Sequence, residues 1–65
     1  MNNEYKQELN KIIIAKRKEL RHRKNILNRN IFAGTCEKSI IAQRNTILYL
    51  EIQINNLEYQ LLHNL

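Results

Sequence analysis

Proline, tryptophan and aspartate are absent from the sequence, and glycine and cysteine occur once each, as Gly34 and Cys36. A single cysteine cannot form a disulfide within the chain, and it fits a reducing compartment. His22 and His63 lie far apart, no cysteine or histidine pair has the spacing of metal ligands, and the acids are scattered along the chain. We therefore expect no metal and no cofactor. Since a chain of 65 residues builds a core with little net stabilisation, we expect a partner subunit to supply the rest.

Long apolar runs are also missing, because no stretch approaches the ~20 apolar residues that a membrane-spanning helix needs. The first five residues lack the charged start and apolar run of a signal peptide. We predict a cytoplasmic protein without a membrane span. No serine or cysteine is spaced to act as a nucleophile with His22 or His63, so we expect no enzymatic activity.

Helix-forming residues run without a breaker on both sides of Gly34, which can supply the left-handed residue that closes a helix. This pattern predicts an all-α fold, an antiparallel two-helix hairpin in the manner of a helical coiled coil, with its turn near Gly34-Thr35. We expect a single domain over residues 1–65, with one helix over about 3–32 and a second over about 36–63. The two helices match in length, as a hairpin requires.

Residues at the expected helix starts support these bounds. Asn2 or Asn3 can cap the first helix, with Glu4 in its first turn. Thr35 is a good N-cap for the second helix, and Glu37 places a negative charge near its free N–H groups.

Apolar residues at helical spacing mark the faces that we expect to pack together. The first helix carries one narrow apolar stripe, the first-helix stripe, interrupted by Lys16 and Arg23. It consists of Tyr5, Leu9, Ile13, Leu20, Leu27 and Ile31. The second helix has an unbroken heptad pattern, the seam, with one polar member. It consists of Ile40, Gln43, Ile47, Leu50, Ile54, Leu57 and Leu61.

A further set of large apolar residues, the second stripe, lies about 130° around the second helix from the seam. It consists of Ile41, Leu48, Ile52, Tyr59 and Leu62. One neighbouring helix cannot cover both the seam and the second stripe. An exposed apolar patch of this kind marks a protein contact, with an external partner or with a second copy of the chain. We predict that the second stripe is the interface with a partner protein. A second copy of the chain, forming a homo-oligomer, is the alternative occupant of this interface.

A single long helix in a coiled-coil oligomer is an alternative, because the heptad of the seam continues upstream in phase. The positions that continue it are Ala33, Ile26, Ile12 and Tyr5. Glu19 would then lie in the seam, and Gly34 inside a continuous helix would cost about 1 kcal/mol. We favour the hairpin on both grounds.

The whole net charge of +5 lies in a basic segment, residues 16–24, where six cations surround Glu19. The cations are Lys16, Arg17, Lys18, Arg21, Arg23 and Lys24. Such a cluster can contact nucleic-acid phosphates or an acidic protein, or it can be a solvated face. It contains no Phe, Tyr or Trp to stack on a base, and its apolar member, Leu20, belongs to the first-helix stripe. We therefore favour a solvated face or a charged protein contact over a small nucleic-acid-binding regulator.

One stretch of the second helix carries a family resemblance. After the Gly34 turn the chain reads Gln43-Arg44-Asn45-Thr46-Ile47-Leu48-Tyr49-Leu50-Glu51, which resembles the second helix of the small needle co-chaperones of type III secretion systems. The rest of the chain is similar through its length and hairpin layout. The resemblance implies a non-enzymatic hairpin that binds a larger tetratricopeptide-repeat chaperone in the bacterial cytoplasm. Together the two would hold a needle subunit unpolymerised until export.

A second resemblance is to the hairpin phosphatases of sporulating bacteria that act on aspartyl phosphates. It lies in Lys16-Arg17-Lys18-Glu19-Leu20 and Leu57-Glu58-Tyr59. That family carries a Ser-Gln-x-Leu-Asp motif in its second helix. The corresponding region here reads Glu51-Ile52-Gln53-Ile54-Asn55 and lacks the aspartate, so we reject that enzyme.

Overall fold

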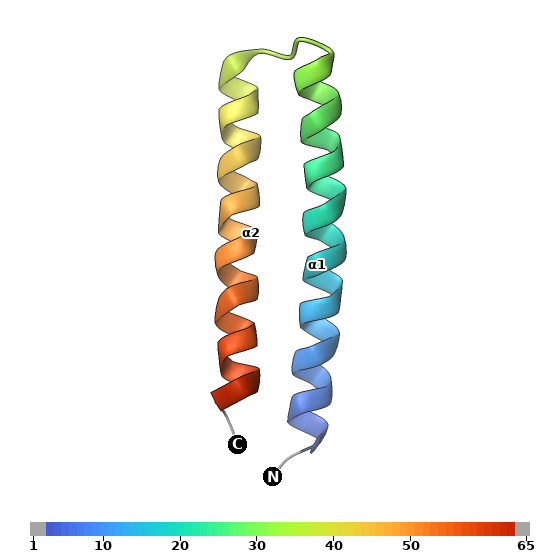
Figure 1. Cartoon of the computed structure of the whole chain (residues 1–65), viewed down its shortest axis with the longest axis vertical. Helices are drawn as coiled ribbons and strands as arrows, with labels where there is room; N and C mark the ends of the chain where they lie inside the picture. The colour runs from blue at the N-terminus through green and yellow to red at the C-terminus, as the bar shows by residue number, and fades with distance from the viewer. Residues whose placement is uncertain (1–2, 64–65) are drawn as a thin grey trace.

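Two antiparallel α-helices lie side by side in the computed structural model, which describes residues 3–63 (Figure 1). α1 spans Asn3–Phe32 and α2 spans Glu37–His63, and no strand occurs among these residues. The start of α1 and the end of α2 lie at the same end of the molecule. The all-α hairpin predicted from the sequence is confirmed, and the alternative of one continuous helix is not formed.

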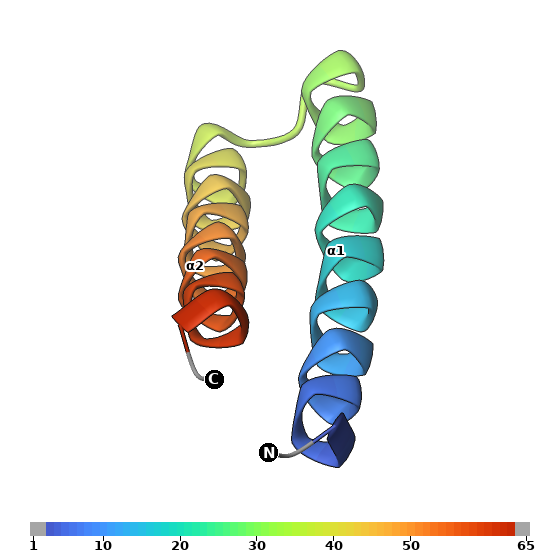
Figure 2. The ribbon, with the colours of Figure 1, turned by 60° about the horizontal axis from the view of Figure 1, so that its bottom comes forward.

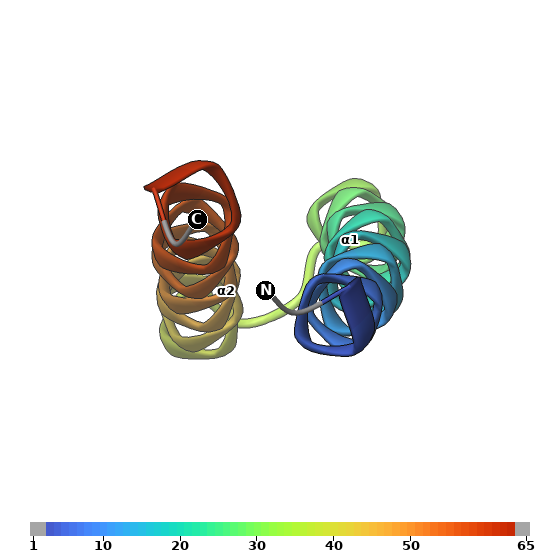
Figure 3. The same cartoon turned by 90° about the horizontal axis from the view of Figure 1, so that it is seen from below.

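The hairpin is a single layer with extents of 50 × 14 × 11 Å. One connection joins the end of α1 to the start of α2, at the end of the hairpin opposite Asn3 and His63 (Figure 2). Seen along the helices, α1 and α2 stand next to each other, and within residues 3–63 no further element covers them (Figure 3). Each helix therefore has one neighbour and can bury only one of its sides.

The end of α1 has the hydrogen bonds of a Schellman motif, in which a left-handed residue closes the helix. The N–H of Thr35 donates to the carbonyl oxygen of Asn30 at 2.9 Å, and the N–H of Gly34 donates to that of Ile31 at 3.1 Å. Gly34 has a φ of 77°, a conformation that glycine adopts without the steric cost of a Cβ. The predicted role of Gly34 as the closing residue of the first helix is confirmed.

The start of α2 differs by one residue from the prediction. The first helical hydrogen bond runs from the N–H of Ile40 to the carbonyl oxygen of Cys36 at 3.1 Å, so Cys36 is the N-cap and α2 begins at Glu37. Thr35, the predicted N-cap, instead belongs to the closure of α1 through its own N–H. At the other end α1 begins at Asn3, and Asn2 lies outside the described residues.

The core lies where the first-helix stripe meets the seam. Six apolar side chains are buried there, each 9% exposed or less: Leu9, Ile13, Leu27, Ile47, Leu50 and Ile54. Four further aliphatic members of the two sets are half-buried; these are Leu20, Ile40, Leu57 and Leu61. None of the described side chains is completely sealed from solvent. The predicted packing is confirmed, and the core that results is thin.

The two ends of the first-helix stripe depart from the prediction. Tyr5 is 43% exposed and Ile31 is 46% exposed, although both were assigned to the packed face. They lie in the first and last turns of α1, where the neighbouring helix covers less of each side chain. The packed part of the first-helix stripe therefore runs from Leu9 to Leu27.

Neither helix has the apolar length that a bilayer crossing needs, within the part of the chain that the structure describes.

Replacing Gly34 by Ala should lower the free energy of unfolding by about 1–2 kcal/mol, because an L-residue is strained in the left-handed region. A Cβ at this position would meet nothing within 4 Å, so the loss reports backbone strain alone. Gly34→Asn is the matched control and should lose less, because Asn tolerates this conformation better. Urea unfolding followed by circular dichroism measures both. Equal stability of Gly34→Ala and wild type would contradict the Schellman closure.

Replacing Ile54 by Ala should lower the free energy of unfolding by roughly 2–5 kcal/mol, enough to melt so small a core. Ile54 is 6% exposed in the seam, whereas Ile52 in the second stripe is 57% exposed. Ile52→Ala is therefore a control of identical chemistry, and at low chain concentration it should change stability much less. Equal losses for the two variants would mean that the faces of α2 are assigned wrongly.

Candidate protein-binding surface

The second stripe lies on the side of α2 that α1 does not cover. Its members are between 50% and 70% exposed, whereas the three buried residues of the seam are between 5% and 7% exposed. The members are Ile41, Leu48, Ile52, Tyr59 and Leu62. As expected from the sequence, one neighbouring helix covers the seam alone. A row of large apolar side chains therefore faces solvent along α2.

Aromatic packing orients one end of this row. The rings of Tyr59 and His63 have centroids 4.1 Å apart and planes inclined by 30°. The two residues are one helical turn apart, so the stack lies along the surface of α2. Tyr59 stays 63% exposed beside His63 and adds to the exposed surface near Leu62.

Two asparagines complete this surface, and sequence reasoning missed them. Asn45 and Asn55 are exposed and fall at the gaps in the second stripe. With them, the spacing along α2 becomes a regular alternation of four and three residues, which is the pattern of a coiled-coil contact. That spacing was the signal that could have identified them. The second stripe together with Asn45 and Asn55 is called the outer face of α2 below.

The basic segment is largely tied into the hairpin. Arg17 forms an ion pair with Glu58, and the Nζ of Lys24 lies 3.3 Å from a carboxylate oxygen of Glu51. Both acids belong to α2, so these pairs link the two helices. The side chains are a third or more exposed, and each such pair therefore contributes well under about 1 kcal/mol once solvent screening is included.

Two more cations of the segment have contacts of their own. The Nε of Arg23 lies 3.0 Å from a carboxylate oxygen of Glu19, one turn earlier on α1. The Nζ of Lys16 donates to the Oε1 of Gln53 at 3.4 Å across the helix interface. Lys18 and Arg21 are exposed and have no such contact within residues 3–63. Of the six predicted contact residues, the structure therefore leaves these two without a protein partner.

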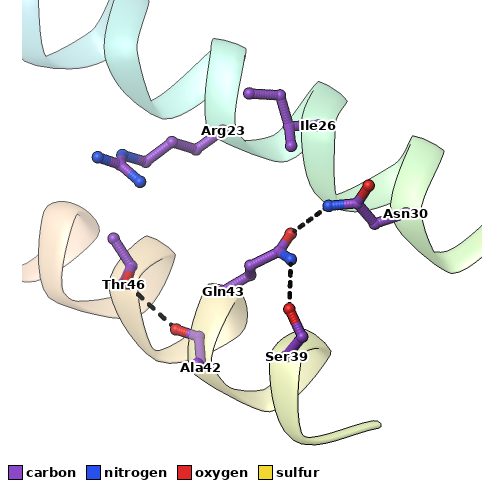
Figure 4. Close-up of a pocket in the computed structure, with 7 residues that line it drawn as sticks. All are labelled: Arg23, Ile26, Asn30, Ser39, Ala42, Gln43 and Thr46. Carbon is purple, nitrogen blue, oxygen red and sulfur yellow. Dashed lines mark hydrogen bonds between the residues drawn. The ribbon is translucent and has the colours of Figure 1, made fainter. Parts of the chain in front are cut away.

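A polar groove lies between the helices near the turn (Figure 4). The Nδ2 of Asn30 donates to the Oε1 of Gln43 at 2.9 Å, and the Nε2 of Gln43 donates to the Oγ of Ser39 at 3.2 Å. These bonds satisfy Gln43, the polar member of the seam. The groove has a volume of about 230 Å³, below the roughly 300–1,000 Å³ of a typical small-molecule site. It serves to join the helices rather than to hold a ligand of that size.

The turn end of the hairpin carries one side chain that the sequence did not single out. Phe32, the last residue of α1, is 95% exposed. Cys36 on the other side of the turn is exposed and free. No group of three or more histidine, cysteine or acidic residues close enough to hold a metal occurs in the described part of the chain. The outer face of α2 remains the most extensive unexplained feature.

Comparison of the chain with protein-family models, with curated proteins and with solved structures finds no match. The resemblance to the needle co-chaperones therefore stays a prediction, and the function has to be argued from the surface itself.

Replacing Lys24 by Glu should lower the thermal stability slightly, because it puts two carboxylates where Lys24 now meets Glu51. The loss should be no more than about 1 kcal/mol and should shrink when salt is added. Lys18→Glu makes the same change of charge at an exposed position without an ion pair, and it is the control. If both variants lose the same stability at low salt, the ion pair between the helices does not contribute.

Proposed function

We propose that this protein is a non-enzymatic protein-binding subunit that acts through the outer face of α2. The observation that carries the proposal is the exposure of the whole second stripe beside a core of only six buried side chains. Contiguous apolar surface of this kind is typical of protein contacts. An amphipathic helix that lays its apolar side into a groove of the partner would bury it.

More specifically, we propose that the protein is a co-chaperone of type III secretion. The hairpin would bind a larger helical-repeat chaperone in the bacterial cytoplasm, and the complex would keep a needle subunit unpolymerised. The support for this form is the resemblance of residues 43–51, together with the hairpin layout and the open face of α2.

The protein would act by binding alone, because covering the partner's apolar surface stabilises the complex without any chemical step. A partner that binds only the folded hairpin stabilises it by about 2.7 kcal/mol when present at a hundred times its dissociation constant. For a hairpin with so thin a core, this is a large fraction of the total stability. The partner would in turn have an apolar groove covered, so each protein would protect the other from aggregation.

We do not assign the basic segment to nucleic acid. Four of its six cations already contact side chains of the hairpin, and a phosphate would have to compete with Glu51 and Glu58 for two of them. The exposed cations Lys18 and Arg21 are better suited to solubilise the hairpin or to meet an acidic rim of the protein partner.

Capture of the tagged chain from a host that carries a type III secretion apparatus tests the specific form. We expect a helical-repeat chaperone and, with it, a needle subunit. Recovery of neither protein would overturn the family assignment.

Replacing Leu48 by Glu should weaken partner binding at least tenfold, or about 1.4 kcal/mol, because it puts a charge into the apolar contact. The isolated chain should stay as helical as wild type, since Leu48 is 55% exposed and the change removes apolar surface from water. Gln60→Glu adds the same charge elsewhere on α2 and should bind normally. Circular dichroism and a binding assay on the same variants suffice. If Leu48→Glu unfolds the chain while Ile54→Ala weakens only binding, the two faces are reversed.

A further inference from the structure

The outer face of α2 has the spacing of a coiled-coil contact and a composition that is complementary to itself. We propose that two copies of the hairpin pair through this face, with the two α2 helices antiparallel and related by a two-fold axis between Leu48 and Ile52. This pairing goes beyond the proposed function and does not depend on it. A second copy and an external partner would compete for the same residues of α2.

Four of the five apolar residues of the second stripe meet one another in this arrangement, whereas Leu62 falls opposite Lys38 of the second copy. In an antiparallel coiled coil, the two kinds of core position face each other across the helices. Leu48 then packs against Ile52 of the second copy, and Ile41 packs against Tyr59 of the second copy. Symmetry repeats each of these layers on the other side of the axis. All four residues are 50% exposed or more in the isolated hairpin and would become buried.

The two asparagines meet each other in the same register. Asn45 faces Asn55 of the second copy, and each amide can donate to and accept from the other. A slip by one heptad in one direction would place Asn45 against Leu62 and Asn55 against Ile52, and a slip in the other direction would place Asn45 against Leu48 and Asn55 against Lys38. In both cases the two amides would no longer meet, and at least one would lie in an apolar contact. A polar pair at such positions is a known determinant of register in coiled coils. The positions of the asparagines therefore favour one register.

Charge complementarity favours the antiparallel orientation. Arg44 and Glu58 lie two heptads apart on one edge of the outer face, and the antiparallel pairing brings Arg44 of each copy next to Glu58 of the other. Glu58 already pairs with Arg17 of its own hairpin, so its carboxylate would be shared between two cations. Arg44 is exposed and has no ion pair within residues 3–63. In a parallel pair, it would instead face Tyr49. Glu51 lies near its symmetry mate at the axis, where Lys24 of each copy, 3.3 Å from its own Glu51, offsets the repulsion.

The solvent-exposed area of the hairpin is larger than that of a compact monomer by about the area that one interface would bury. The chain exposes 5270 Å², whereas a compact monomer of 7.9 kDa exposes about 4,400 Å². The difference, roughly 850 Å², is close to the ~800 Å² that each partner buries in an interface of standard size. The single-layer form leaves the open sides of both helices in solvent, and the outer face of α2 is one of these sides.

Disulfide trapping tests the register directly. In a Cys36→Ser background, one chain carries Asn45→Cys and a second chain of different mass carries Asn55→Cys. Oxidation of the mixture should give mainly the disulfide between the two kinds of chain, and either chain alone should give little. Dominant disulfides between identical chains would overturn the antiparallel register. Both variants should fold because the substituted positions are exposed in the hairpin, and circular dichroism checks this.

Sedimentation equilibrium of the wild-type chain at micromolar concentration supplies the second readout. We expect a dimer that Leu48→Glu weakens at least tenfold. A wild-type monomer would overturn the homodimer, even if the capture experiment returns a repeat chaperone and so supports the proposed function. A dimer together with an empty capture would support the homodimer and overturn the co-chaperone role.

Discussion

Packing of the first-helix stripe against the seam is the interaction on which the rest of the structure depends. Two helices in one layer can bury one side each, and here that side holds six buried side chains. The same contact sets the antiparallel register that brings Arg17 to Glu58 and Lys24 to Glu51. It also leaves the large apolar residues of α2 that lie outside the seam exposed to solvent. The thin core and the exposed outer face of α2 thus have one cause.

A second layer of protein packed on α2 would both enlarge the thin core and cover the exposed outer face. Covering the outer face of α2 buries large apolar side chains without disturbing the seam, because the two faces lie on different sides of the helix. An external protein or a second copy of the chain could cover this face, and the two would exclude each other. Self-pairing would then protect the apolar face until the external partner is present, and the affinity for that partner would be reduced by the cost of separating the dimer.

Much of the fold could be predicted from the sequence because it depends on local chemistry and on periodicity. Gly34 is the only glycine of the sequence and so marks the left-handed closure, and the heptad of Ile47, Leu50 and Ile54 marks the buried side of α2. The N-cap was misplaced because Thr35 already serves the closure of α1. The ion pairs across the helices could not be predicted, since they depend on the exact register. The exposure of the second stripe could be predicted as well, because one neighbouring helix covers only the seam.

The central claim is that another protein surface covers the outer face of α2, and that in the purified protein this surface belongs to a second copy of the chain. The most direct test measures the melting temperature of the chain at a series of protein concentrations. Association that stabilises the folded state makes the melting temperature depend on concentration. The account predicts a melting temperature that rises with concentration for wild type and stays constant for Leu48→Glu. A wild-type melting temperature that does not change with concentration would contradict it.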